Sequence, residues 1–203
     1  MLILVRHGRT AANASGLLLG RLDPELDELG VQQAEAVAAA LADGHPVHDG
    51  IGGIGRIVAS PLSRTRATAE AIGRRCGVAV ELDDQWLELD YGDFDGLPLA
   101  DVPSSIWKSW RVDSSFAPPN GESIAALGVR VRRALDALAA AAHDENIVVV
   151  SHVSPIKAAV AWALDVGDEV AWRMFLAPAS ITRVAVSERG ASLTLFNDTS
   201  HLG

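Results

Sequence analysis

The stretch Met1-Leu2-Ile3-Leu4-Val5-Arg6-His7-Gly8-Arg9-Thr10 decides how this chain can be organised. Its first five residues are apolar, which is typical of a strand buried on both faces. The run ends in a cation, a histidine and a glycine, so a potential nucleophile follows the strand directly. Ligands bind at the carboxyl ends of the strands in open α/β sheets. The stretch therefore predicts a functional His7, although alone it also fits a histidine that merely ends an edge strand.

The neighbours of His7 suit an anionic ligand. Arg6 carries a planar guanidinium that matches phosphate oxygens. Gly8 lets another group approach the backbone closely, because it has no side chain. Together these residues indicate a site for a phosphate group.

The rest of the chain alternates between strand-like and helix-like segments. We expect helices from Asp27, as the N-cap, to about Ala42, from Pro61 to about Cys76, over residues 121–142, and from Ser154 to about Leu164. Strand-like runs occupy residues 2–5, 56–59, 78–82, 147–150, 181–186 and 193–196. The alternation predicts an α/β fold, a three-layer α/β/α sandwich with a mostly parallel central sheet and an antiparallel edge hairpin. We expect a single domain over residues 1–203, because neither a repeat nor a linker divides the sequence.

Composition excludes several classes of protein. With 203 residues, 49% of them hydrophobic, the chain can bury a sizeable core. A net charge of −9 argues against general binding to nucleic acid or to anionic membranes. Cys76 is the only cysteine, so a disulfide framework and a thiolate metal cluster are excluded. No apolar run approaches the about 18 residues of a membrane span, and the apolar N-terminal segment lacks the features of a signal peptide. We therefore expect a cytoplasmic location.

Two segments do not fit the alternation. Residues 44–55 contain five glycines and precede a strand, so they lack the context of a phosphate-binding glycine loop and indicate a surface loop. Residues 96–120 contain four prolines together with Trp107, Trp110 and Phe116. This segment is interpreted as a partly helical excursion that covers a site. Alternatively, its aromatic side chains pack it onto its own domain.

Charged and polar side chains follow three of the predicted strands. Arg6 and His7 end the first strand, and His152 follows the run at residues 147–150. Arg64 lies in the first turn of the helix that follows residues 56–59, where backbone N–H groups and the helix dipole favour an anion. Parallel strands bring these ends to one edge of the sheet, so the four side chains should converge on an anionic ligand.

At this point the sequence resembles a known family. The patterns are Arg6-His7-Gly8-x-Thr10-x-x-Asn13, Ser60-Pro61-Leu62-x-Arg64-x-x-x-Thr68-Ala69, Leu87-Glu88 with Gly92 and Gly96, and Ser151-His152. In this order they are similar to the histidine phosphatase superfamily, in the branch of the cofactor-dependent phosphoglycerate mutases and α-ribazole phosphatases. The segment from Ser151 to Asp198 also resembles the phosphatase half of actinobacterial proteins that fuse it to a ribonuclease H domain.

The resemblance implies a mechanism. Neutral His7 would attack the phosphorus of a phosphomonoester and form a phosphohistidine. Glu88 would protonate the leaving group and then activate water, which requires a raised pKa, to which apolar contacts would contribute. Asp90 is the rival carboxylate, although it is offset from the family's position. Neither a metal nor a cofactor is implied.

The resemblance also implies how the phosphoryl oxygens are held. Arg6, Arg64 and a protonated His152 would neutralise them, with Asn13 as a neutral donor.

The partner implied is a small-molecule phosphomonoester. Arg21 lies in a loop that is beside the substrate in relatives. Relatives commonly have glycine where this chain has Val153, which would shape the leaving-group pocket. Arg9 replaces an acidic or polar residue and would favour a substrate with a second anionic group. The sequence leaves the natural substrate and the oligomeric state open, a homodimer included.

Three alternatives differ from a hydrolase. A phosphoglycerate mutase uses the same residues, but it carries longer insertions around the covering segment than residues 96–120 provide. A non-catalytic phosphoryl-binding protein has no need of Glu88. In a two-histidine metal hydrolase, the arginines beside His7 and His152 would repel the cation. The sequence therefore favours a metal-independent phosphomonoesterase.

Overall fold

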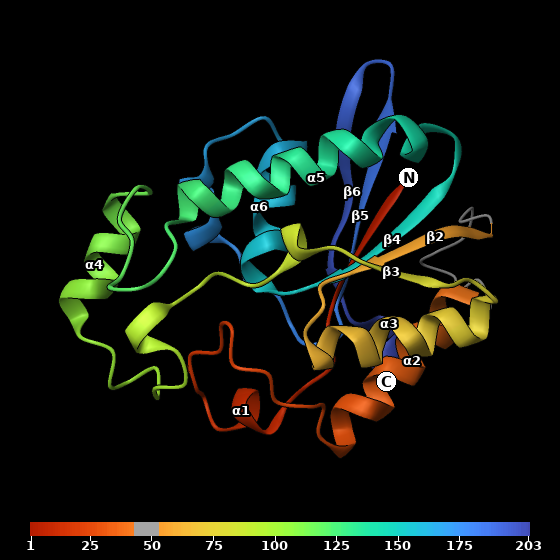
Figure 1. The fold of residues 1–203 in the computed structure, drawn as a ribbon. Coiled ribbons are helices and arrows are strands. Elements are labelled where there is room, and N and C mark those ends of the chain that lie inside the picture. Colours follow the sequence, from red (N-terminus) through yellow and green to blue (C-terminus); the bar gives the residue numbers. More distant parts are fainter. Residues whose placement is uncertain (43–52) are drawn as a thin grey trace.

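The computed structural model describes residues 1–42 and 53–203, and within these ranges six strands form one sheet. Their order across the sheet is β3-β2-β4-β1-β5-β6 (Figure 1). The first four pair in parallel, whereas β5 is antiparallel to β1 and β6 is antiparallel to β5. The strands are β1 (Leu2–Arg6), β2 (Ile54–Ala59), β3 (Val80–Leu82), β4 (Asn146–Ser151), β5 (Ile181–Ser187) and β6 (Gly190–Asp198).

Helices cover both faces of the sheet. Figure 1 shows α2 (Glu28–Ala42) and α3 (Ser63–Cys76) on one side, and α5 (Ile124–Asp144) and α6 (Val153–Ala163) on the other. Two shorter helices, α1 (Ala11–Ala14) and α4 (Ser104–Val112), lie in the connecting segments. The predicted three-layer sandwich with an antiparallel edge hairpin is confirmed.

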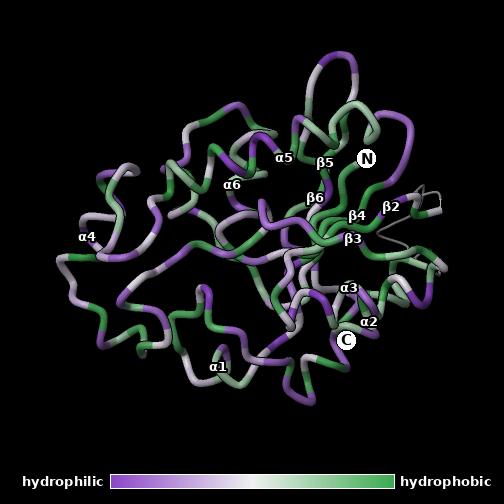
Figure 2. The backbone as a smooth tube through the Cα atoms, in the orientation of Figure 1, coloured by the Kyte–Doolittle hydropathy of each residue, from purple (hydrophilic) through white to green (hydrophobic). Residues whose placement is uncertain are grey.

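The core is divided between the two faces by the alternation of the strands. Leu2 and Leu4 pack with α5 and α6, whereas Ile3 and Val5 pack with α2 and α3. All four side chains are completely buried, and each such burial stabilises the fold by about 1.5–3 kcal/mol. Figure 2 shows the hydrophobic residues concentrated in the central strands. The first strand is therefore central, as its apolar sequence requires.

The register of the three central strands aligns the residues that follow them. Val5 pairs with Val150, which in turn pairs with Ala59. One step further along the chain, the backbone N–H of His7 donates to the carbonyl of Ser151 at 3.1 Å. The strand ends that carry the candidate site are therefore direct neighbours.

Helix α3 begins later than predicted. Pro61 precedes the helix, and Leu62 is its N-cap, in an extended conformation without a side-chain cap. The cap comes instead from Asp23, whose carboxylate accepts hydrogen bonds from the Ser63 backbone N–H at 2.7 Å and from the Ser63 hydroxyl at 2.8 Å. A distant residue thus sets the start of the helix.

The two irregular segments are placed as follows. In the glycine-rich segment 44–55, residues 44–52 lie outside the described residues, and β2 begins at Ile54.

The excursion 96–120 contains α4, and Trp110 in it is only 1% exposed. The Trp110 ring contacts the rings of Tyr91, Phe94, Trp107 and Phe116, with centroids 5.3–6.2 Å apart. The aromatic side chains therefore pack the excursion onto neighbouring segments.

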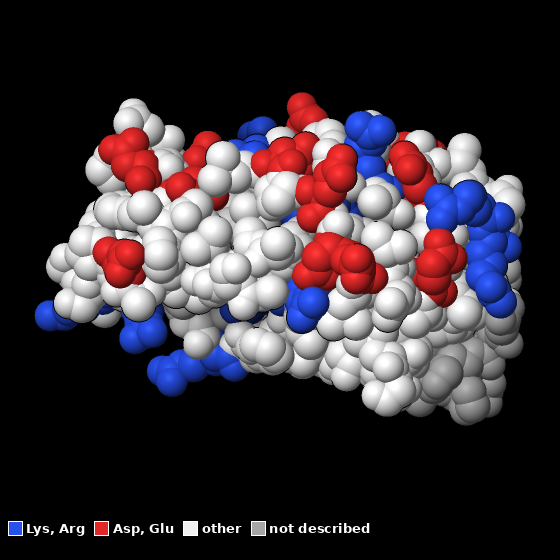
Figure 3. All heavy atoms as spheres, turned by 90° about the horizontal axis from the view of Figure 1, so that it is seen from below, with Lys and Arg blue, Asp and Glu red and all other residues white. Residues whose placement is uncertain are grey.

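The surface carries charges of both signs. Figure 3 shows acidic and basic side chains intermixed on one face of the molecule, with acidic groups spread along its middle. Among the described residues, none of the helices combines the length and the apolar character needed to cross a membrane.

Candidate active site

Four buried side chains meet where β1, β4 and α3 come together. His7 follows β1, His152 follows β4, Arg6 is the last residue of β1, and Arg64 is the second residue of α3. Their exposed fractions are 2%, 0%, 9% and 0%, and the two imidazole centroids lie 5.2 Å apart. The structure thus brings together the four residues that the sequence places at strand ends.

The His7 ring has a defined tautomer. Its Nδ1 lies 2.7 Å from the carbonyl oxygen of Gly8, which can only accept a hydrogen bond, so Nδ1 carries the proton. Burial, together with the charges of Arg6 and Arg64, lowers the pKa of His7 well below its usual range. The ring is therefore neutral at pH 7 and its Nε2 lone pair is available as a nucleophile.

His152 is also neutral in the protein without a bound anion. Burial is the main cause that lowers the pKa of His152 well below its usual range, and the charge of Arg64 adds to it. The protonated His152 expected around a bound phosphoryl group stays a prediction. Nε2 of His152 lies 2.8 Å from the hydroxyl of Ser60, whereas its buried Nδ1 has no partner.

Backbone carbonyls hold the two arginines. Arg6 Nη1 donates to Leu176 O at 2.6 Å, and Arg64 donates to Leu22 O at 2.7 Å and to Gly20 O at 2.8 Å. Burial lowers the pKa of Arg6 to about 10 and also lowers that of Arg64, and both guanidinium groups remain charged at neutral pH. The carbonyls carry no full charge, so they neutralise neither group. Arg64 Nη1 also lies 3.9 Å from a carboxylate oxygen of Asp23, whereas Arg6 makes no ion pair among the described residues.

The pocket also contains buried nitrogen atoms without partners. Nε of Arg6, Nε of Arg64 and Nδ1 of His152 make no hydrogen bond in the described protein. Unpartnered buried donors are costly, by about 1–3 kcal/mol each. Two of these nitrogen atoms are guanidinium donors, and Nδ1 of His152 is a third donor in the tautomer whose Nε2 accepts from the Ser60 hydroxyl. The three form a cradle suited to a polyanionic group such as a phosphoryl group.

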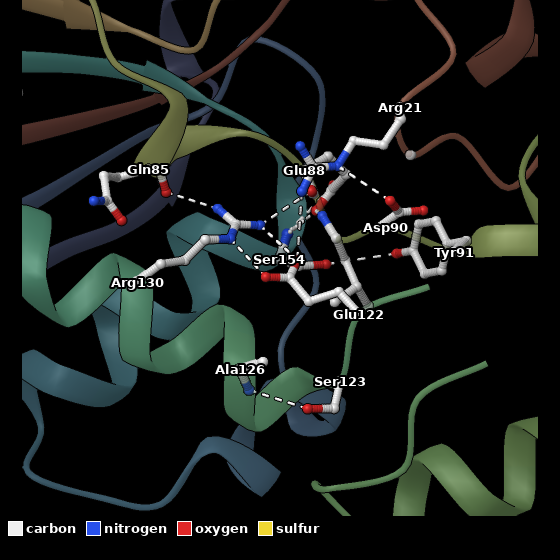
Figure 4. Close-up of polar contacts among 12 residues, drawn as sticks. Arg21, Gln85, Glu88, Asp90, Tyr91, Glu122, Ser123, Ala126, Arg130 and Ser154 are labelled. Carbon is white, nitrogen blue, oxygen red and sulfur yellow. Dashed lines mark hydrogen bonds and ion pairs between the residues drawn. The ribbon is translucent and has the colours of Figure 1, made fainter. Parts of the chain in front are cut away.

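Glu88 borders this pocket and is only 3% exposed. Its carboxylate accepts hydrogen bonds from the backbone N–H groups of Leu89 at 2.7 Å, Val153 at 3.0 Å and Ser154 at 3.1 Å (Figure 4). Val153 and Ser154 begin α6, whose N-cap residue His152 makes no side-chain cap. Glu88 therefore caps α6 from a distant part of the chain.

The backbone around Glu88 is held by residues that the sequence does not reveal. Arg130 of α5 donates to the carbonyls of Gln85 at 2.7 Å and Glu88 at 3.1 Å (Figure 4). It also forms a bidentate ion pair with Glu122 at 2.8 and 2.9 Å. Arg130 thus fixes the segment that presents Glu88. No local pattern identifies this role, because Arg130 lies 42 residues from Glu88.

Asn13 and Arg9 have partners of their own. The Asn13 carbonyl oxygen accepts from the Thr10 backbone N–H at 3.2 Å in a capping box, which leaves its amide NH2 available as a donor. Arg9 forms an ion pair with Asp27 at 2.8 Å, so its charge is already compensated.

The remaining predicted residues border Glu88. Arg21 approaches Glu122 at 3.6 Å and Asp90 at 4.0 Å, which places it over the Glu88 segment. Val153 contributes its backbone N–H to Glu88. Asp90 accepts from the Gly92 backbone N–H at 2.9 Å, as a turn residue does.

Comparison with known proteins agrees with this geometry. Residues 2–199 match the model of the histidine phosphatase superfamily (branch 1). The chain is 36% identical over 205 residues to the bifunctional protein Rv2228c of Mycobacterium tuberculosis, covering 99% of this chain and 54% of that protein. It is 31% identical over 206 residues to phosphoserine phosphatase 1 of Hydrogenobacter thermophilus, covering 100% of this chain and 94% of that protein.

A solved structure is similarly close. The mycobacterial glucosyl-3-phosphoglycerate phosphatase in complex with VO3 superposes with a TM-score of 0.85 at 30% identity, covering 98% of this chain and 99% of that one. By contrast, this chain spans about half the length of the bifunctional mycobacterial relative. The matched length, the shared fold and the site motifs together show that the chain belongs to branch 1 of the histidine phosphatase superfamily.

Proposed function

We propose that the chain is a phosphomonoesterase that hydrolyses a small phosphorylated metabolite through a phosphohistidine, without a metal ion. The observation that carries the proposal is a neutral, buried His7 beside the unpartnered nitrogen atoms of Arg6, Arg64 and His152. Relatives over nearly the whole chain are named as phosphatases of phosphoserine and of glucosyl-3-phosphoglycerate, which supports this class of reaction.

In the first step Nε2 of His7 attacks the phosphorus, and the P–N bond forms as the bond to the ester oxygen breaks. Arg6 and Arg64 neutralise the charge on the non-bridging oxygens, with Asn13 as a neutral donor. The negative charge of the bound phosphoryl group favours protonation of His152, which then donates to it. Positioning and electrostatic stabilisation supply most of the catalysis in phosphoryl transfer.

Glu88 is proposed as the proton donor to the leaving alkoxide and then as the base that activates water. Both tasks require one carboxyl oxygen to leave the backbone N–H groups of α6 and face the substrate. Arg130 keeps the main chain of Glu88 in place during this exchange. Asp90 is the second candidate, and a Glu88→Gln variant that keeps its activity would favour it.

The test measures phosphate release from a panel of phosphomonoesters in the presence of a chelator, between pH 5 and 8. We expect turnover by the wild type and at least a thousandfold loss in His7→Ala. An acid-labile, base-stable phosphoenzyme should be trapped from the wild type and not from the variant. Substantial turnover by His7→Ala would refute the role of His7, and loss of activity in chelator would refute metal independence. Stimulation by a bisphosphorylated glycerate, with phosphoryl return to the substrate, would instead indicate a mutase.

A further inference from the structure

Residues 20–22 form a bend whose backbone is held by the side chain of Asp95. The Asp95 carboxylate accepts hydrogen bonds from three consecutive backbone N–H groups, those of Gly20 at 2.7 Å, Arg21 at 2.7 Å and Leu22 at 2.8 Å. Successive N–H groups in a turn form a concave site for an anion, and hydrogen bonds to a charged acceptor are about twice as strong as neutral ones. Within the part of the chain that the structure describes, Asp95 is the only partner of these three N–H groups.

The carbonyls of the same bend hold Arg64. Leu22 O accepts from Nη1 of Arg64 at 2.7 Å, and Gly20 O accepts from Nη2 at 2.8 Å. Because a guanidinium is a rigid plane, hydrogen bonds from both Nη atoms fix its orientation, and with it the direction of the unpartnered Nε. The bend thus connects one carboxylate to the guanidinium that faces the phosphate pocket.

The chain on each side of the bend is anchored without Asp95. The backbone N–H of Leu18 donates to Leu97 O at 2.8 Å, and the N–H of Gly96 donates to Leu18 O at 2.7 Å. After the bend, the Asp23 carboxylate caps α3. Loss of the Asp95 carboxylate should therefore displace the bend without unfolding the segment around it.

We propose that Asp95 is a positioning residue for phosphate binding, because it fixes the bend whose carbonyls set the orientation of Arg64. This inference rests on the proposed function and adds to it a residue that acts through Arg64. The same pair of residues is connected by charge alone, with the opposite expected sign. Burial lowers the pKa of Arg64, whereas nearby carboxylates, that of Asp95 among them, raise it. Removal of this negative charge would by itself strengthen the binding of an anion, so a weaker affinity would report the loss of positioning.

The test measures the binding of inorganic phosphate to the wild type and to Asp95→Asn by calorimetric titration. Asparagine keeps the shape of the side chain, but its NH2 group would face at least one of the three N–H donors. We expect the affinity for phosphate to fall at least tenfold. The matched control is Asp93→Asn, which removes the same charge two residues away, where the carboxylate accepts from the Asn120 amide at 2.9 Å. In this control the affinity should change less than twofold.

A double-mutant cycle with Arg64→Lys distinguishes positioning from a general loss of structure. Lysine keeps the positive charge, but its single nitrogen cannot bind both carbonyls of the bend and also face the phosphate. Adding Asp95→Asn to Arg64→Lys should therefore change the affinity less than threefold. If Asp95→Asn does not fold, Asp95→Glu replaces it, because the longer side chain keeps the charge and displaces the carboxylate from the bend. The same tenfold loss is expected there.

Each other outcome overturns the proposal. An affinity in Asp95→Asn that equals or exceeds that of the wild type would show that only its charge acts on the pocket. A tenfold loss that persists in the Arg64→Lys background would show that the effect does not pass through Arg64, and an equal loss in Asp93→Asn would show that it is not specific to the bend. A wild type that binds no phosphate would leave Asp95 nothing to position.

Hydrolysis decides the proposed function separately. A wild type that binds phosphate but hydrolyses no ester would refute the proposed function, while the cycle with Arg64→Lys would still decide the role of Asp95. A wild type that hydrolyses esters, with unchanged phosphate binding in Asp95→Asn, would refute only the positioning role.

Discussion

Replacing Glu88 by glutamine should lower the free energy of unfolding as well as the activity. The carboxylate accepts three backbone N–H groups, two of them from the first residues of α6. In glutamine an NH2 group replaces one oxygen, so one N–H donor faces another donor, which costs about 1 kcal/mol. Loss of the negative charge at a partly buried helix N-terminus costs about 1 kcal/mol more. We therefore expect a loss of about 2 kcal/mol.

Thermal unfolding and urea titration measure this change. For a chain of this size, each kcal/mol shifts Tm by about 2–4 °C, so Tm should fall by about 4–8 °C. The control is Glu70→Gln, an exposed glutamate on α3, which should change stability by less than about 0.5 kcal/mol. In the same variant, loss of general acid–base catalysis should lower kcat about 10²–10⁴-fold. The loss of kcat/KM should be smallest for an aryl phosphate, whose leaving group needs no proton.

A Glu88→Gln protein as stable as the wild type would refute the capping argument. An equal loss of kcat/KM, which reports formation of the phosphoenzyme, for alkyl and aryl esters would refute the role as proton donor to the leaving group. These two results are independent, because one concerns the folded protein alone and the other concerns the reaction.

Three other perturbations test the burial of the two histidines, the positioning of Glu88 and the packing at Gly8. Burial lowers the pKa values of His7 and His152 in the folded protein. As the pH falls below about 6.5, the histidines of the unfolded chain therefore become protonated while those of the folded chain stay neutral. The free energy of unfolding should thus be highest above that pH and should fall below it by up to about 1.4 kcal/mol per pH unit for each histidine. In His152→Asn, urea titrations should show roughly half of this pH dependence. Arg130→Met should lower kcat about tenfold and shift the pH–rate profile. Arg130→Lys should restore only part of the activity, because lysine lacks the bidentate fork. An unchanged pH–rate profile in Arg130→Met would exclude a positioning role. A Cβ at Gly8 would lie 2.3 Å from the Gly30 carbonyl oxygen, so Gly8→Ala should cost about 1–3 kcal/mol by thermal unfolding, and a neutral effect would contradict this packing.

Much of the fold and of the phosphate pocket could be predicted because its signals are local. The apolar run before Arg6 and His7 identifies a buried strand, and a parallel sheet brings the ends of its strands to one edge. His152 and Arg64 follow from the same rule. Gly8 was expected to allow a close approach, and the group that approaches is the Gly30 backbone.

The rest depends on contacts between distant residues. Arg130 supports Glu88 from α5, and a cavity that Lys157 lines forms only where α5, α6 and residues 168–172 meet. Helix α3 starts at Ser63 rather than Pro61, because its cap, Asp23, lies 40 residues away. The neutral state of His152 likewise follows from its burial beside Arg64, and the residues next to His152 in the sequence do not predict it.

The position of β1 between β4 and β5 has a consequence for how the protein is made. Both neighbours of this first strand come from the last third of the chain, β4 at Asn146–Ser151 and β5 at Ile181–Ser187. A ribosome adds about 5–20 residues per second, so β1 waits roughly 10–40 s for its partners. Throughout that time the apolar residues 2–5 have no sheet in which to bury themselves. The apolar residues of β1 therefore stay exposed to aggregation until β4 and β5 have been made, and a chaperone that shields them over that interval should raise the yield of folded protein.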